Sequence, residues 1–173
     1  PSLVKPEVKY SEIHLAAVTR LGSALKELGI MKGNIQDAVK AGAMGLFMPH
    51  GLGHMMGLDV HDMENYGENY VGYDKKNVRS TQFGLSSLRL GRELQEGFVI
   101  TNEPGCYFIP ALIDKWKAEI KCNDFIDYKV LETYKDFGGI RIEDDLLVTK
   151  DGCRLLGKYI PKTVNEIEEQ MSL

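Results

Sequence analysis

Residues 138–149 read GGIRIEDDLLVT, and this stretch carries the clearest β-strand pattern in the chain. Gly138 and Gly139 open it, and a Lys-Asp-Gly turn at residues 150–152 closes it. Apolar side chains, several of them β-branched, recur through residues 140–149, as they do on a pleated and half-buried surface. We therefore predict one strand over residues 140–149.

Shorter strand patterns lie on both sides of this stretch. Residues 98–102 (FVITN) follow a turn, and residues 105–109 continue beyond a proline. Residues 154–159 follow the Lys-Asp-Gly turn, and residues 45–50 form a short apolar run. Apolar runs of this length between turn residues indicate strands, so we predict four more.

Helical patterns occupy both ends of the chain. Apolar residues recur at spacings of three and four over residues 10–29, where Ser11 is the expected N-cap, and again over residues 34–42. Residues 163–171 predict a terminal helix capped by Thr163. Helices followed by runs of strands predict an α+β domain with a mainly antiparallel sheet.

The composition is that of an ordinary globular domain. The chain has 173 residues, of which 43% are hydrophobic and 27% charged, and its formal net charge is −4. This balance argues against a nucleic-acid partner, and apolar runs long enough to span a membrane do not occur. The cysteines are odd in number and widely spaced, which favours free thiols and a cytoplasmic location. The first residues suggest a cut inside a longer protein.

Three of the four histidines lie in residues 48–62, which read MPHGLGHMMGLDVHD. Glycines separate His50, His54 and His61, and glycine is used where backbones approach closely or adopt positive φ. We expect these histidines to project from irregular chain around a cleft. The spacing lacks the glutamate of a helical zinc-protease motif, which argues against a simple zinc protease of that type.

Acidic residues follow at two strand positions. Glu103 ends a strand in ITNEPG, and Glu143 lies within residues 138–149. On a strand, Arg141 and Glu143 share one face. Taken singly, each acid suits an exposed strand end or edge, and each histidine suits a structural role. Together they favour a buried polar site whose charges are paired or bound to metal.

The three motifs in this order resemble the prolidase and Xaa-Pro aminopeptidase branch of the pita-bread metallopeptidases. The resemblance implies a pita-bread (creatinase/aminopeptidase-like) fold, with a curved antiparallel sheet backed by helices. It also implies that residues 1–173 are the C-terminal portion of a single catalytic domain, an incomplete fold without the N-terminal domain and the first aspartate hairpin. The implied reaction is hydrolysis of Xaa-Pro peptide bonds at two divalent metal ions.

The resemblance assigns three metal ligands, His54, Glu103 and Glu143, and makes Glu103 the proton shuttle as well. Arg141 matches a residue that orients ligand carboxylates. One imidazole with several carboxylates suits Mn²⁺, with Co²⁺ or Zn²⁺ as other occupants.

The same resemblance assigns residues to the substrate. His50 and His61 match the family's histidines that contact substrate and stabilise the tetrahedral intermediate. Arg89 matches an arginine that binds the substrate's C-terminal carboxylate, although Arg79 and Arg92 lie nearby. The expected substrate is a proline-containing peptide, and Arg89 tips the choice between dipeptidase and aminopeptidase slightly toward dipeptidase.

Two features depart from the family. The family's two aspartate ligands lie on a hairpin that precedes the helices, and the chain lacks this hairpin. We therefore expect this chain alone to bind metal weakly and to have little or no peptidase activity. The sheet edge and apolar surface left open predict a homo-oligomer or a covering partner. Residues 63–87 form a long polar loop, either a lid over the cleft or a solvated insertion.

Two other functions stay open at this point. Pita-bread domains also serve as non-catalytic peptide- or protein-binding modules, but such a module would not need to keep three metal ligands. Another pita-bread hydrolase, such as a creatinase or a methionine aminopeptidase, fits the DVHD and GGIRIEDD details less well.

Overall fold

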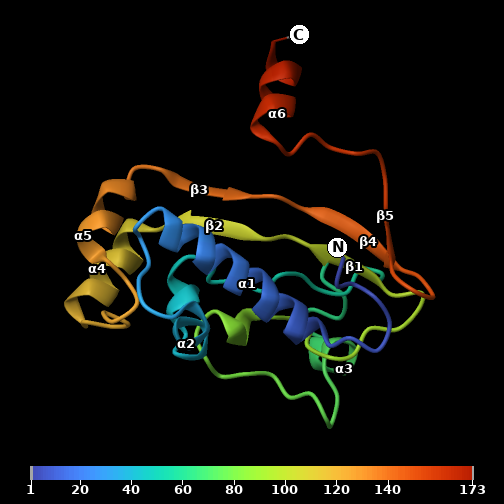
Figure 1. Ribbon diagram of the computed structural model, residues 1–173. Helices are drawn as coiled ribbons and strands as arrows, with labels where there is room; N and C mark the ends of the chain where they lie inside the picture. The colour runs from blue at the N-terminus through green and yellow to red at the C-terminus, as the bar shows by residue number, and fades with distance from the viewer. Residues whose placement is uncertain (1, 173) are drawn as a thin grey trace.

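The computed structural model describes residues 2–172 (Figure 1). Helical segments and antiparallel strands are both present, which confirms the predicted α+β class. The helices are α1 (Tyr10–Glu27), α2 (Ile35–Lys40), α3 (Glu68–Gly72), α4 (Pro110–Ala118), α5 (Tyr128–Leu131) and α6 (Val164–Met171), with short 3₁₀ turns η1 (Ala43–Leu46), η2 (Leu85–Ser87) and η3 (Glu132–Tyr134). The strands are β1 (Val99–Asn102), β2 (Gly105–Phe108), β3 (Gly138–Arg141), β4 (Asp144–Val148) and β5 (Cys153–Leu155).

The strands form one long antiparallel hairpin with an interruption in its middle. β1 pairs with β4, which also pairs with β5, and β2 pairs with β3. Asn102 lies opposite Asp144 and Gly105 opposite Arg141, so the two ladders share one register. The single strand predicted over residues 140–149 is therefore wrong, because it is split into β3 and β4. Pro104 stands at the break, where it has no N–H to donate to the ladder.

Helix α1 runs along the strands and covers them, as Figure 1 shows. Its buried residues include Tyr10, Ile13 and Val18, which belong to the main hydrophobic core. The helix begins after Lys9, whose extended backbone (φ −72°, ψ 131°) makes it the N-cap, so the prediction that Ser11 is the cap is wrong. This packing fixes the start of α1 beneath residues 50–54, the HGLGH segment.

Three further differences separate the observed elements from the expected ones. The apolar run at residues 45–50 is not a strand, because η1 (Ala43–Leu46) takes its first part. The strand expected over residues 154–159 is limited to β5. Helices α4 and α5, between β2 and β3, were not predicted, although α4 begins with Pro110 at its first position, a common helix start.

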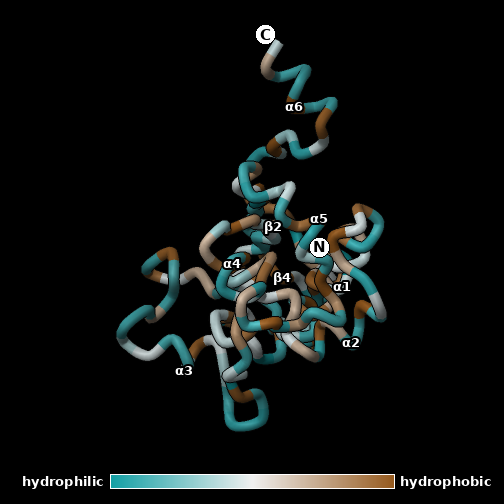
Figure 2. The backbone as a smooth tube through the Cα atoms, turned by 90° about the vertical axis from the view of Figure 1, so that its left-hand side faces the viewer, coloured by the Kyte–Doolittle hydropathy of each residue, from teal (hydrophilic) through white to brown (hydrophobic). Residues whose placement is uncertain are grey.

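Helix α6 stands away from the rest of the chain (Figures 1 and 2). Thr163 caps it as predicted, because its hydroxyl accepts from the Glu166 amide while the Glu166 carboxylate accepts from the Thr163 amide. The backbone amides of Thr163 and Lys162 lower the pKa of Glu166 to about 2. No helix within residues 2–172 is both long and apolar enough to cross a lipid bilayer.

Candidate active site

The HGLGH segment is irregular chain that lies beside β1 and accepts backbone hydrogen bonds at its edge. The Thr101 amide donates to the His54 carbonyl at 3.0 Å, and the Glu103 amide donates to the Leu52 carbonyl at 2.7 Å. A Cβ on Gly53 would lie 2.2 Å from the Thr101 carbonyl oxygen, so only glycine permits this approach. The glycines thus allow the histidines to reach the acidic end of β1.

The His54 ring faces the Glu103 carboxylate. His54 Nδ1 lies 2.9 Å from the Met55 carbonyl oxygen, to which it donates, so the neutral ring has its lone pair on Nε2. That Nε2 lies 3.4 Å from Glu103 Oε1. The Thr101 hydroxyl donates to the same carboxylate oxygen at 3.1 Å and accepts from the His54 amide at 3.0 Å. A carbonyl partner on Nδ1 and a free Nε2 facing a carboxylate form the arrangement of a metal-binding histidine.

Arg141 lies between the two strand carboxylates. The shared register places Glu143 directly opposite Glu103, and the Ile142 amide donates to the Pro104 carbonyl at 3.1 Å between them. Arg141 Nη1 is 3.3 Å from Glu103 Oε2, and its Nε is 3.8 Å from Glu143 Oε2. Two like charges placed opposite each other destabilise a sheet unless a cation lies near them.

The expectation that Arg141 and Glu143 form a buried site is wrong. Their side chains are 47% and 45% exposed, because the hairpin is open to solvent where the ladder is interrupted. Within residues 2–172, no group of three or more His, Cys, Asp or Glu side chains lies close enough together to hold a metal ion. His54 and Glu103 have the donor types that bind a divalent metal, and Glu143 lies on the same face of the hairpin as Glu103. In this structure, however, the positive charge beside the two carboxylates is the Arg141 guanidinium group.

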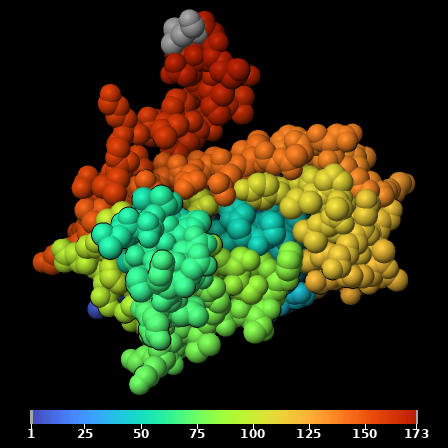
Figure 3. Space-filling model, turned by 180° about the vertical axis from the view of Figure 1, so that it is seen from behind, coloured from blue at the N-terminus to red at the C-terminus, as the bar shows by residue number. Residues whose placement is uncertain are grey.

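Six of the seven predicted site residues line one cavity of about 250 Å³. Glu143 is the exception. Figure 3 shows this side of the molecule, where the teal segment around residues 45–55 lies in a hollow below the yellow and orange strands. The lining residues are His50, Gly51, Gly53, His54, His61, Ser87, Arg89, Glu103 and Arg141.

The two other histidines of the motif have different surroundings. His50 Nδ1 donates to the Gly51 carbonyl at 2.7 Å, while its Nε2 is buried without a hydrogen-bond partner in the described part of the chain. The His61 ring meets the His54 ring edge to face at 4.4 Å, and its Nδ1 lies 2.7 Å from Glu64 Oε2. A buried and unpartnered ring nitrogen at a cavity wall suits a group that contacts a ligand.

The fourth histidine, His14, belongs to this region and was missed from the sequence. It lies buried on α1, where its Nδ1 accepts from the Leu52 amide at 3.1 Å. Burial, with a smaller effect from His50, lowers the pKa of His14 to about 4. His14 therefore stays neutral and holds the backbone between His50 and His54. Its place on the apolar stripe of α1 was the only sequence signal.

Tyr10 supports β1 from the same helix and was also missed. Its hydroxyl donates to the Thr101 carbonyl at 2.6 Å, and the side chain is fully buried. Burial, and then the charge of Glu103, raise the pKa of Tyr10 above its usual range. Thr101 thus receives one hydrogen bond from α1 and supports Glu103 through its hydroxyl.

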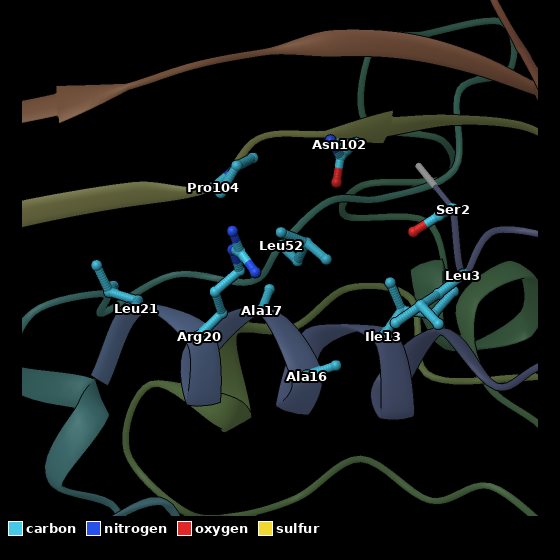
Figure 4. A pocket seen from close by; sticks show the side chains of 10 residues that line it. All are labelled: Ser2, Leu3, Ile13, Ala16, Ala17, Arg20, Leu21, Leu52, Asn102 and Pro104. Atoms are coloured by element: carbon cyan, nitrogen blue, oxygen red, sulfur yellow. The ribbon is translucent and has the colours of Figure 1, made fainter. Parts of the chain in front are cut away.

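A larger cavity of about 490 Å³ lies on the other side of the sheet, between α1 and the break from β1 to β2. Figure 4 shows the Ile13, Ala17 and Leu21 side chains of α1 beside it, with Arg20 extending toward the strands. Apart from Arg20 its lining residues carry no ionisable side chain. Chemistry at acids and histidines therefore belongs to the smaller cavity.

Residues 2–150 match the sequence pattern of metallopeptidase family M24. The chain belongs to that family. Among its M24 relatives, human Xaa-Pro dipeptidase is 41% identical over 169 residues, which is 98% of this chain and 33% of that protein. A probable Xaa-Pro aminopeptidase of Fusarium vanettenii is 38% identical over 171 residues, 99% of this chain and 35% of that protein. The chain thus spans about a third of the length of these relatives.

Solved M24 structures share the fold. Zinc-substituted aminopeptidase P of Escherichia coli, in complex with product, is 33% identical with a TM-score of 0.67, and the match covers 98% of this chain and 30% of that one. Proline aminopeptidase P II of Yersinia pestis is 30% identical with a TM-score of 0.66, covering 99% and 31%. These similarities confirm the predicted pita-bread fold, of which this chain carries a part, and a metal-dependent peptidase family.

Proposed function

We propose that this chain contributes His54, Glu103 and Glu143 to a two-metal centre of a peptidase that cleaves the bond before proline. The main support is the contact between His54 Nε2 and Glu103 Oε1, an imidazole nitrogen and a carboxylate oxygen 3.4 Å apart at the wall of one cavity. A divalent cation would satisfy both, and one imidazole with two carboxylates suits Mn²⁺, with Co²⁺ or Zn²⁺ as alternatives.

The remaining residues of the cavity would act on the substrate. The metal pair, when bound, supplies a Lewis acid that polarises the scissile carbonyl. Glu103 would carry a proton to the leaving proline nitrogen, which requires the position at the cavity wall that it occupies. His50 would contact the substrate through its unpartnered Nε2, and His61 would act beside His54. Arg141 would orient the two carboxylates that it contacts, and move from between them when metal binds.

Two expectations about the whole protein belong to this proposal. We propose a cytoplasmic enzyme whose substrates are proline-containing peptides. We also propose that the open apolar side of α1 is covered in the active protein, by a second copy or by another part of the same protein. The cavity of Figure 4 and the 51% exposure of Leu3 beside it support a covered face.

The test compares metal content and hydrolysis of an Xaa-Pro peptide in Mn²⁺ buffer. One sample is the 173-residue chain, and the other is a form extended at the N-terminus to include the family's aspartate hairpin. Hydrolysis only by the extended form, and its loss in Glu103→Gln, is the expected result. Robust turnover by the 173-residue chain would show that its own ligands suffice. Inactivity of both forms without bound metal would favour a non-catalytic peptide-binding module.

A further inference from the structure

Arg89 lines the candidate site, but carboxylates already occupy both ends of its guanidinium group. Its Nη2 lies 2.6 Å from Glu64 Oε1, and its Nη1 contacts Glu68. Glu68 also binds Arg79 through its other oxygen. The two arginines and two glutamates therefore balance in charge before any substrate is present. A substrate carboxylate that binds Arg89 would therefore place a third negative charge beside the two arginines.

The two glutamates differ in what they hold. Glu68 bridges two arginines and is 19% exposed, so it is a fixed part of this cluster. Glu64 is 40% exposed and bridges Arg89 to His61, whose Nδ1 lies 2.7 Å from Glu64 Oε2. Glu64 is thus the more accessible of the two carboxylates. It lies where a ligand carboxylate bound to Arg89 would meet it.

Two cavities also meet at Arg89. One is the candidate site, of about 250 Å³, and the other, of about 440 Å³, is lined by Glu64 and Glu68 together with polar neighbours. Arg89 is the residue common to both linings. Space beyond Arg89 therefore exists for a peptide that continues past proline, while the position that a terminal carboxylate would take is held by Glu64.

We propose that Glu64 is a specificity-determining residue, which competes with a substrate's terminal carboxylate for Arg89 and disfavours free dipeptides relative to amidated or longer proline peptides. This inference rests on the proposed peptidase function, because Arg89 is taken as the group that meets the substrate's C-terminal side. It answers the choice between dipeptidase and aminopeptidase in favour of longer substrates.

The test is a binding titration of the 173-residue chain by NMR, with alanyl-proline and with alanyl-prolinamide. Glu64→Gln keeps the shape of the side chain and its hydrogen-bonding oxygen but removes the charge. Because exposed ion pairs are weak, we expect this variant to bind the acid about two- to fivefold more tightly. Affinity for the amide should stay unchanged. Glu96→Gln, the same charge change at an exposed residue before β1, should alter neither affinity.

Several results would overturn the proposal. An unchanged ratio of acid to amide affinity in Glu64→Gln would do so, and so would an equal gain for both ligands or no detectable binding of the acid to the variant. An equal gain in the Glu96→Gln control would mean that net charge alone is responsible. Since the titration needs no turnover, a lack of Xaa-Pro hydrolysis by the extended form would count against the proposed function but would not affect this binding comparison.

Discussion

Neutral His14 makes the stability of the folded chain depend on pH in a defined window. The His14 pKa is lowered from 6.5 to about 4, because the ring is buried and His50 lies near. Between these values the unfolded chain binds a proton that the folded chain does not. Stability therefore falls as the pH drops through the window, by about 1.4 kcal/mol per pH unit and about 3 kcal/mol in all. Above pH 6.5 this residue adds no pH dependence.

His14→Asn isolates this effect. Asn cannot titrate, yet its side-chain oxygen can still accept from the Leu52 amide, which His14 Nδ1 now binds at 3.1 Å. We expect the wild-type chain to lose about 3 kcal/mol relative to this variant between pH 7 and pH 4. Urea unfolding followed by circular dichroism at pH 7, 5.5 and 4 measures the difference.

His14→Leu serves as the matched comparison. It removes both the proton site and the acceptor, so it should be about 1–3 kcal/mol less stable than His14→Asn at every pH, because the Leu52 amide is left buried without a partner. If the wild-type and His14→Asn stabilities instead change in parallel with pH, the assignment of a neutral, buried His14 is refuted.

Three further predictions concern the support of the site and the terminal helix. Gly53→Ala should lower the free energy of unfolding in urea by about 3 kcal/mol or more, because its Cβ would lie 2.2 Å from the Thr101 carbonyl oxygen. Gly152→Ala, whose Cβ would lie 4.0 Å from its nearest neighbour, should lower it little. Equal losses in the two variants would contradict the close approach at Gly53. Tyr10→Phe should destabilise the chain by about 1–2 kcal/mol, because the same carbonyl loses its donor, and a neutral result would show that water replaces the hydroxyl. Thr163→Ala removes the N-cap of α6 and should shift its helix–coil equilibrium about fivefold toward coil, measured by Cα chemical shifts. Chemical shifts at the candidate site should stay unchanged, and changes there would mean that α6 packs against the rest of the chain.

The elements that the sequence predicted well are those determined by residues close together in the chain. The short apolar run that forms β1 and the capping box at Thr163 each depend on a few neighbouring residues, and both lie where expected. The split of residues 138–149 depends on Pro104, more than thirty residues earlier, which interrupts the opposite strand. The apolar run at residues 45–50 was ambiguous by period, since short helical turns and strands share such runs. Its middle is held by a tertiary hydrogen bond, in which the Tyr107 amide donates to the Phe47 carbonyl at 2.8 Å.

The candidate site was predicted through its motifs and not through its supports. The resemblance to the family named six residues that do line one cavity, although their roles stay proposals. It said nothing of His14 or Thr101, whose contacts join α1, the HGLGH segment and β1. It also could not show that Glu64 binds Arg89, because the two residues are 25 positions apart and meet only through the fold. The exposure of Glu143 followed from the break in the ladder, which alternation along one strand could not reveal.

The most direct test of a metal centre at His54, Glu103 and Glu143 is the loss of amide NMR signals when Mn²⁺ is added at low stoichiometry. The proposal predicts that signals around these three residues broaden before the rest of the chain, and that Glu103→Gln removes the effect. Broadening that spreads evenly over other acidic segments, such as α6, and persists in Glu103→Gln would contradict it.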